Sequence, residues 1–193
     1  MSILEVSGIR KVYTGRFGGH KVEALRNVSF SVENGEYVAI MGESGSGKTT
    51  LLNILAALDK PTEGRVVLDG QELSKVKEGQ IAAFRRDNLG FVFQEFNLLD
   101  TFTIEDNIYL PLVLAGKPHK EMQQRLKPIA AQLGISDLLK KYPYEVSGGQ
   151  KQRAAVARAI ITNPKLVLAD EPTGALDSKA TDELLSLFTR INE

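Results

Sequence analysis

The chain has 193 residues, 42% of them hydrophobic, and its 24 acidic residues balance its 24 basic ones. This length predicts one domain, with room for an inserted subdomain. The charge balance argues against nucleic acid as the main partner, because binding to a phosphate backbone usually requires a basic excess. The absence of cysteine excludes disulfides and thiolate metal sites and favours a reducing cytoplasm. No apolar run reaches roughly 18 residues, and the opening residues lack the apolar core of a signal peptide.

The first half of the chain reads as strands followed by a helix. Apolar residues alternate over 28–32, which is typical of a strand with one face on a core, and Asn34-Gly35 supplies a turn. The continuously apolar stretch 37–41 predicts a strand covered on both faces. Residues 49–58 predict a helix that Pro61 stops.

The second half is mainly helical. Short strands are predicted at 65–68, 89–93 and 166–169, and helical spacing dominates from 103 to 161. Two prolines inside that region, Pro111 and Pro128, are expected to bend or break their helices. Residues 178–191 read as a closing amphipathic helix. The predicted fold is therefore an α/β layered core with a mostly parallel sheet, a small antiparallel β part at the start and a helical insert.

Residues 42–49, GESGSGKT, fit the pattern GxxxxGK[ST] and lie between the predicted buried strand and a helix, which is the context that this motif requires. Glycines allow successive N–H groups to point at phosphate oxygens, and the helix dipole adds positive potential. Lys48 would reach the outer phosphates and the Thr49 hydroxyl would bind Mg²⁺. The alternative is a flexible turn with a solvated lysine.

Two carboxylates, Asp170 and Glu171, follow the predicted strand 166–169. Adjacent residues at a strand end can point in different directions, so Asp170 could hold Mg²⁺ while Glu171 polarises the attacking water. Such a pair can also simply begin a loop or cap a helix. Its coexistence with a phosphate loop favours the functional interpretation.

A second turn of small residues, at 146–149, opens another helix whose N-terminus can bind an anion. The alternative is an ordinary helix N-cap formed by Ser147. Two anion-binding helix ends serve one nucleotide only if they approach it from opposite sides.

These motifs together resemble the nucleotide-binding subunit of an ABC transporter. The resemblance runs along the whole chain in the family's order: GESGSGKT, Gln94 in FVFQEF, VSGGQ, LVLADEP and ALD at 175–177. It implies a P-loop NTPase core of the RecA-like type, one ABC ATPase domain over 1–193, and a helical subdomain at about 95–161. It also implies that two subunits pair head to tail, with each ATP between the phosphate loop of one and the signature helix of the other.

The resemblance assigns roles to individual residues. The catalytic residues would be Glu171 as base, Lys48 and Gln94, and the Mg²⁺ ligands would be Thr49, Gln94 and Asp170. Nucleotide contacts are implied for Tyr13, Gly42, Ser44, Gly45, Ser46, Gly47, Lys48, Thr49, Thr50, Ser147, Gly148, Gly149, Gln150 and Asp177.

Three of these residues also allow a plainer interpretation. Tyr13 matches an aromatic ring that stacks on adenine, but it could be a half-buried strand tyrosine. Gln94 matches a sensor that links nucleotide to the membrane partner, but it could be a polar residue at a strand end. Asp177 matches a loop that crosses to the other subunit, but it precedes Ser178 and could contribute to helix capping.

Finer resemblance points to the branch of lipoprotein-release, macrolide-export and antimicrobial-peptide-resistance ATPases. AALDKPTEG and FNLLDT are most similar to the bacitracin-type systems. This implies a peripheral subunit on the cytoplasmic face of the membrane that binds a transmembrane permease through the insert, where 96–102 supplies apolar and acidic surface. The substrate would be an antimicrobial peptide or a lipophilic molecule.

Other functions share part of this pattern. An ABC ATPase of the cell-division type, which drives a membrane regulator instead of transport, would carry every motif above. ABC ATPases of DNA repair or translation require a coiled-coil insertion or tandem cassettes, and the sequence shows neither. An inactive nucleotide-binding module is a further alternative.

The family's switch histidine is the one element that the sequence lacks. It is expected on a strand beyond the helix after Asp177, whereas the sequence given stops at Glu193, and its two histidines, His20 and His119, lie in other contexts. The chain therefore resembles a C-terminally truncated cassette, in which ATP binding should be less affected than hydrolysis and a sheet edge would be left unpaired.

Overall fold

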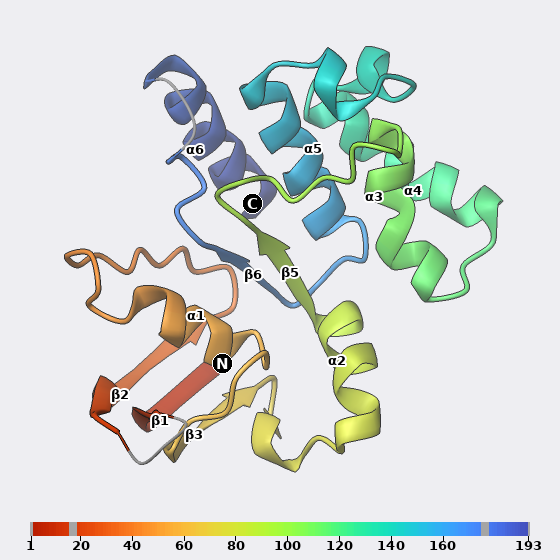
Figure 1. Ribbon diagram of the computed structural model, residues 1–193. Helices are drawn as coiled ribbons and strands as arrows, with labels where there is room; N and C mark the ends of the chain where they lie inside the picture. The colour runs from red at the N-terminus through yellow and green to blue at the C-terminus, as the bar shows by residue number, and fades with distance from the viewer. Residues whose placement is uncertain (1, 16–18, 175–177, 193) are drawn as a thin grey trace. The chain divides into compact units, whose positions relative to one another are not determined.

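A computed structural model describes residues 2–15, 19–174 and 178–192. Its contacts divide the chain into two compact units, one reaching to Ala82 and the other running from Ala83 to Ile191. Figure 1 labels the main helices and strands of both units.

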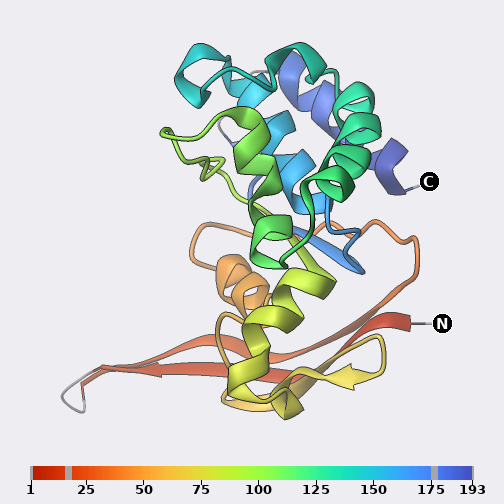
Figure 2. The same cartoon turned by 90° about the vertical axis from the view of Figure 1, so that its right-hand side faces the viewer.

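The first unit is built on an antiparallel sheet. Its strands are β1 (Ser2–Thr14), β2 (Lys21–Glu33), β3 (Glu63–Leu68) and β4 (Gln71–Glu72), in the order β2-β1-β3-β4. Figure 2 shows β1 and β2 running side by side as two long strands, as their antiparallel register requires. The helix α1 (Lys48–Leu55) packs against β2, and two 3₁₀ turns follow the sheet, Leu73–Lys75 and Glu78–Gln80. The antiparallel β part expected at the start of the chain is confirmed.

The alternation that predicts a strand at 28–32 is confirmed within β2. Val28, Phe30 and Val32 are buried or half-buried, whereas the residues between them are exposed. The turn at Asn34-Gly35 is also present, with Gly35 at a φ of 76°, a backbone conformation that glycine adopts without steric cost.

The prediction of a covered strand at 37–41 is wrong. Residues 36–43 form no strand, and the side chains of Tyr37, Val38, Ile40 and Met41 are exposed, Met41 by 90%. A strand requires a neighbour that pairs with its N–H and C=O groups, and no described strand of the first unit pairs with this segment. An apolar run alone therefore did not distinguish a sheet strand from an exposed approach to the glycine-rich loop.

The end of α1 also differs from the prediction. The helix ends at Leu55, well before Pro61, and Ala57 has a φ of 54°. The backbone leaves the helical conformation there because a left-handed residue cannot continue a right-handed helix. Pro61 therefore does not stop this helix.

The second unit combines a parallel strand pair with helices. Its strands β5 (Leu89–Val92) and β6 (Leu166–Ala169) pair in parallel, in the register that joins Val92 to Ala169. The helices are α2 (Ile81–Asn88), which begins just before this unit, α3 (Ile104–Leu114), α4 (His119–Gln132), α5 (Gly148–Ile160) and α6 (Ser178–Asn192), with 3₁₀ turns at Ser136–Leu138 and Pro143–Glu145. The predicted strands at 89–93 and 166–169 are confirmed, and among described residues the parallel sheet has only these two strands.

Neither internal proline breaks its helix. Pro111 lies inside α3 and Pro128 lies inside α4. Each proline removes one helical hydrogen bond. The helices persist because packing holds them: α3 and α4 contribute Ile104, Ile108, Leu112 and Leu126 to a buried core.

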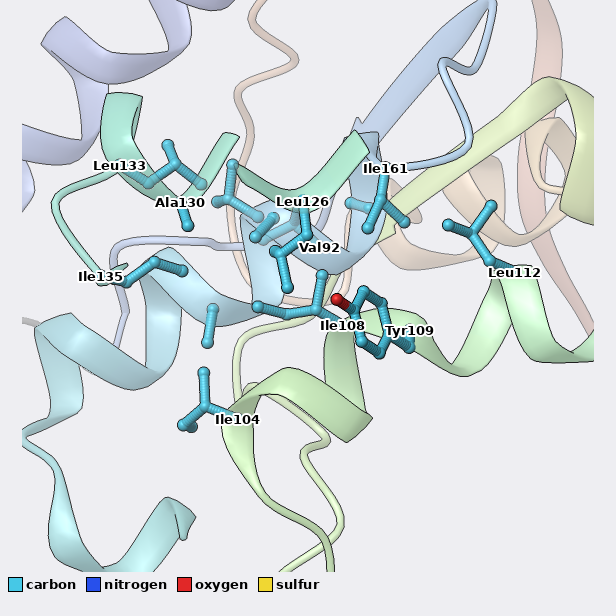
Figure 3. Close-up of a cluster of buried hydrophobic side chains, with 14 of the residues drawn as sticks. Val92, Ile104, Ile108, Tyr109, Leu112, Leu126, Ala130, Leu133, Ile135 and Ile161 are labelled. Carbon is cyan, nitrogen blue, oxygen red and sulfur yellow. The ribbon is translucent and has the colours of Figure 1, made fainter. Parts of the chain in front are cut away.

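The core of the second unit joins β5 to four helices, α3, α4, α5 and α6. Figure 3 shows Val92, Ile108 and Leu126, from β5, α3 and α4, converging in it. The helix α5 contributes Ala154, Val156 and further small residues, which allow α3 and β5 to approach it closely. Among the described residues, none of the helices has the length and apolar character needed to cross a membrane.

Candidate functional site

The glycine-rich loop directly precedes α1. The Lys48 ammonium donates hydrogen bonds to the carbonyl oxygens of Gly42 and Glu43, at 2.9 and 3.0 Å. The Ser46 N–H donates to the Glu43 carbonyl at 3.1 Å and tightens the turn. The lysine thus folds back over the loop that precedes it, and the loop encloses a positive charge.

Glycine is required at position 47 for two reasons. Its φ is 94°, and a Cβ atom there would lie 2.4 Å from the carbonyl oxygen of Ala24 on β2. The loop therefore lies directly on the backbone of β2. Gly47 is also the N-cap of α1 and has no side chain that could accept a hydrogen bond from the first N–H groups of the helix. Such a helix start suits an anionic ligand.

In the second unit, the parallel pairing of β5 and β6 brings two predicted motifs together. The Asp170 N–H donates to the carbonyl of Val92, the last residue of β5, at 3.0 Å, which extends the pairing one residue past the end of β6. Gln94 follows β5 and the acidic pair follows β6, so both motifs lie at the carboxyl edge of the pair. The segment after β6 lies directly against Gln94 at Gly174, because a Cβ atom on Gly174 would lie 2.9 Å from the Gln94 amide nitrogen.

Backbone strain lies at the predicted catalytic base. Glu171 has a φ of 44°, in the left-handed region, and its side chain is exposed. Such strain costs about 1–3 kcal/mol and persists only where surrounding contacts impose it. One contact comes from Gln152 of α5, which is fully buried and donates from Nε2 to the Pro172 carbonyl at 2.7 Å. The other amide atom, Oε1, has no hydrogen-bond partner among described residues.

The turn of small residues at 146–149, which matches the family's signature motif VSGGQ, forms a capping box at the start of α5. The Ser147 hydroxyl accepts a hydrogen bond from the Gln150 N–H, and the Gln150 amide oxygen accepts one from the Ser147 N–H at 2.9 Å. The interpretation as an ordinary N-cap is therefore correct for the geometry of this chain. The Gly148 and Gly149 positions at the first helical turn remain compatible with an anion, because neither carries a side chain.

An arginine connects the signature helix to the loop after Gln94. Arg158 of α5 donates to the carbonyl oxygens of Phe96 and Asn97, at 2.7 and 2.5 Å. Both loop residues have left-handed backbones, with φ of 62° and 49°. Burial lowers the pKa of Arg158 from its usual value. A desolvated cation on two carbonyls holds this strained turn in place.

Tyr13 lies near the end of β1 and is 42% exposed. Its hydroxyl donates to the Asp59 carboxylate at 2.8 Å, and the Lys11 ammonium lies 4.8 Å from the centre of its ring. This exposure is compatible with base stacking and equally with the interpretation as a partly covered strand tyrosine.

The remaining predicted residues are placed as follows. Thr49 and Thr50 lie in the first turn of α1, Ser44 is exposed in the loop, and Asp177 lies outside the described residues. In the part of the chain that the structure describes, no group of three or more His, Cys, Asp or Glu side chains could hold a metal ion. A Mg²⁺ site here would therefore depend on hydroxyl, amide and phosphate oxygens as well as a carboxylate.

Sequence reasoning missed five residues that shape these motifs: Lys11, Asp59, Gln152, Arg158 and Gly174. For Gln152 and Arg158 the available signal was a polar side chain inside the small-residue run of α5, where burial forces a hydrogen-bonded partner. For the other three the sequence carried no signal, since their partners come from distant parts of the chain.

Comparison with known proteins agrees with the motifs. A model of the ABC transporter family matches residues 25–174. The "Bacitracin export ATP-binding protein BceA" of Halalkalibacterium halodurans is 49% identical over 193 residues, which are 100% of this chain and 76% of that protein. The "Lipoprotein-releasing system ATP-binding protein LolD" of Aquifex aeolicus is 45% identical over 99% of this chain and 83% of that protein. A solved dimeric structure of the ATP-binding cassette MJ0796, in a post-hydrolysis state bound to ADP and Pi, matches with a TM-score of 0.86 and 39% identity over 98% of this chain and 83% of that one.

The chain therefore belongs to the ABC transporter family, as an ATP-binding and ATP-hydrolysing subunit with the P-loop NTPase fold. Within the family it falls in the branch that contains bacitracin-export and lipoprotein-release ATPases. The family and branch predicted from the motifs are confirmed. The roles of individual residues stay predictions, as do the limits of the helical subdomain.

Proposed function

We propose that this chain binds ATP with Mg²⁺ through the loop 42–50 and hydrolyses it with Glu171 as base, and that turnover drives a permease which removes an antimicrobial peptide or a lipophilic substrate. The observation that carries the proposal is the loop itself. Lys48 is held over the loop carbonyls, Gly47 lies on the β2 backbone, and the helix behind them has an uncapped N-terminus.

In this proposal the loop N–H groups and Lys48 bind the phosphates, and the lysine exchanges its two carbonyl acceptors for phosphate oxygens. Thr49, Gln94 and Asp170 are the Mg²⁺ ligands, and bound Mg²⁺ supplies charge neutralisation at the phosphates. Glu171 accepts a proton from the attacking water. The left-handed backbone of Glu171 and the hydrogen bond from Gln152 to Pro172 hold the segment that follows β6. They thereby fix the position of the Glu171 carboxylate.

Two copies would act together, head to tail. Ser147, Gly148, Gly149 and Gln150 of one subunit would contact the nucleotide held by the phosphate loop of the other, with Asp177 also at that interface. The dimeric state of the related cassette MJ0796 supports pairing. The first turn of α5 supports the contact, because its glycines leave backbone N–H groups unshielded by side chains.

The membrane partner would bind the segment 96–102 on the cytoplasmic face. Leu99 and Phe102 expose 45% and 39% of their surface there, beside the acidic Asp100. Asn107 holds this segment through hydrogen bonds. Its fully buried side-chain amide accepts a hydrogen bond from the Leu99 N–H and donates to the carbonyl oxygens of Leu99, Phe102 and Thr103. The bacitracin exporter among the relatives supports a peptide substrate.

ATP binding by Lys48→Ala, measured by calorimetry, tests the proposal. Removing the ammonium should weaken ATP binding at least about tenfold, the loss that corresponds to roughly 1.4 kcal/mol. Lys120→Ala, which removes an exposed lysine from α4, is the matched control and should bind as the unaltered chain does. Equal ATP affinity in Lys48→Ala and Lys120→Ala would refute the assignment of the phosphate site.

A further inference from the structure

The first unit contains a hydrogen-bonded cluster of three side chains: Lys11, Tyr13 and Asp59. Lys11 and Tyr13 stand two residues apart on β1, and Asp59 lies in the turn after α1. One Asp59 oxygen accepts from the Lys11 ammonium at 2.6 Å and from the Lys60 N–H at 2.7 Å. The other accepts from the Tyr13 hydroxyl at 2.8 Å. Both carboxylate oxygens are therefore used.

This cluster holds the Tyr13 ring at two points. The hydroxyl is tethered to Asp59, and the Lys11 ammonium lies over the ring, at 4.8 Å from its centre. Lys11 is itself fixed, since its side chain is only 12% exposed and its ammonium also donates to the Lys60 carbonyl at 2.7 Å. A cation on one face of the ring leaves the opposite face as the surface that another flat group can cover.

The carboxylate remains charged in this setting. Its burial opposes ionisation, but hydrogen bonds from Lys11, Tyr13 and the Lys60 N–H outweigh that effect and lower the pKa of Asp59 below its usual value. The phenol therefore donates to an anion, and charge-assisted hydrogen bonds of this kind are stronger than neutral ones.

The cluster belongs to the same packed body as the phosphate loop. Gly47 of the loop lies against Ala24 and Leu25 of β2, and Leu25 pairs across the sheet with Lys11. Asp59 follows the helix that begins at the loop, and its N–H donates to Asn53 of the last turns of that helix. The sheet and α1 thus fix both the loop and the ring in one unit.

We propose that Asp59 and Lys11 are positioning residues for nucleotide binding, which hold the Tyr13 ring as a preformed platform on which the nucleobase stacks on the face away from the ammonium. This inference rests on the proposed ATP site and deepens it. A ring that is already ordered loses less conformational entropy when the base arrives, so the two residues act on affinity through Tyr13 and touch no phosphate.

The test compares two ligands, ATP and inorganic tripolyphosphate, each with Mg²⁺. Both carry the three linked phosphates that the loop 42–50 would bind, and only ATP carries a base. Tyr13→Ala should weaken ATP binding about tenfold, in line with the stacking of a base on an aromatic ring. Asp59→Ala should weaken it about three- to tenfold. Affinity for tripolyphosphate should stay within about twofold in both variants, because neither side chain contacts a phosphate in this account.

Further variants separate positioning from general stability. Asp59→Asn keeps the size and one acceptor oxygen and should give a smaller loss in the same direction. Asp137→Ala, which removes an exposed aspartate from the other unit, should change neither ligand. In a Tyr13→Ala background, Asp59→Ala should have no further effect on ATP affinity, because its action passes through the ring.

The outcomes are distinct. Parallel losses for ATP and tripolyphosphate in the Asp59 variants would overturn the inference and leave Asp59 a merely structural residue. Undiminished ATP affinity in Asp59→Ala, or an additive loss in the double variant, would overturn it as well. An unaltered chain that binds ATP no tighter than tripolyphosphate would refute the platform and spare the phosphate site, whereas a chain that binds neither would refute the proposed function itself.

Discussion

Gly47→Ala should destabilise the first unit far more than substitution of another glycine in the same loop. An alanine at this position must adopt a φ of 94°, which costs about 1–2 kcal/mol for a residue with a Cβ atom. Its Cβ would also lie 2.4 Å from the Ala24 carbonyl oxygen and 2.9 Å from a Leu25 methyl group. Relief of such a clash by shifts of the backbone costs about 1–3 kcal/mol more. The free energy of unfolding should therefore fall by about 2–5 kcal/mol.

Gly45→Ala is the matched control. Gly45 has a φ of 80°, but a Cβ atom there would meet nothing within 4 Å, so only the backbone cost of about 1–2 kcal/mol applies. Gly70→Ala, outside the loop, has a φ of 75° and equally open surroundings, and should match it. Each alanine also restricts the unfolded chain by a similar amount, which cancels in the comparison.

Urea unfolding followed by far-ultraviolet circular dichroism, without nucleotide, measures these differences; the chain has no tryptophan for a fluorescence assay. Equal losses in Gly47→Ala and Gly45→Ala would show that the loop does not lie on β2 as described.

Further predictions concern the second unit. Arg158→Met should lower the free energy of unfolding by about 2–4 kcal/mol, because the carbonyl oxygens of Phe96 and Asn97 lose their charged donor. Arg158→Lys should recover only part of this loss, since an ammonium lacks the two parallel N–H donors of a guanidinium. Chemical denaturation measures both variants. Asn107→Asp retains the acceptor and loses the donors to three carbonyls, so limited proteolysis should cut the segment 96–102 faster than in the unaltered chain; unchanged cutting would contradict the role of this amide. Burial and the neighbouring Glu105 raise the pKa of Tyr109 to about 12. The contribution of the protonated phenol to stability is therefore fully present below pH 10 and declines as the pH rises through 12. Ultraviolet titration should show a phenol that ionises near pH 12, and Tyr109→Phe should remove this step.

The motifs could be predicted from sequence because each is a local pattern with a local cause. In GESGSGKT the turn ends at Gly47, and α1 begins at the next residue, Lys48. Ser147 and Gln150 close a capping box across three residues. In both cases the chemistry lies within one turn of chain, so residue types and spacing suffice.

The errors came from contacts between distant residues. The amino-acid types at 37–41 do not indicate whether a partner strand is present. The same run of apolar side chains is compatible with a covered strand and with an exposed segment. The prolines inside α3 and α4 were expected to bend or break these helices. Neither helix is broken, because the residues around each proline are buried against other elements and packing outweighs the loss of one hydrogen bond. The end of α1 depended on the conformation of Ala57, a residue type with no preference for the left-handed region.

The partners of the residues that support the site could not be predicted from sequence for the same reason, even where a polar side chain in α5 signalled that a partner must exist. Arg158 reaches carbonyls 61 and 62 positions away, and Tyr13 is tethered to a carboxylate 46 positions away. Pairings of this kind depend on the folded chain, whereas the motif residues that they support are recognisable by type alone.

The central claim is that Glu171 is the base for ATP hydrolysis, and Mg²⁺-dependent turnover by the chain and by Glu171→Gln tests it most directly, with ATP binding measured in parallel. The substitution keeps the shape of the side chain and removes its capacity to accept a proton, which typically costs about 10²- to 10⁴-fold in rate. The account predicts that ATP binding is retained and turnover is lost. Equal turnover in the two proteins would contradict it.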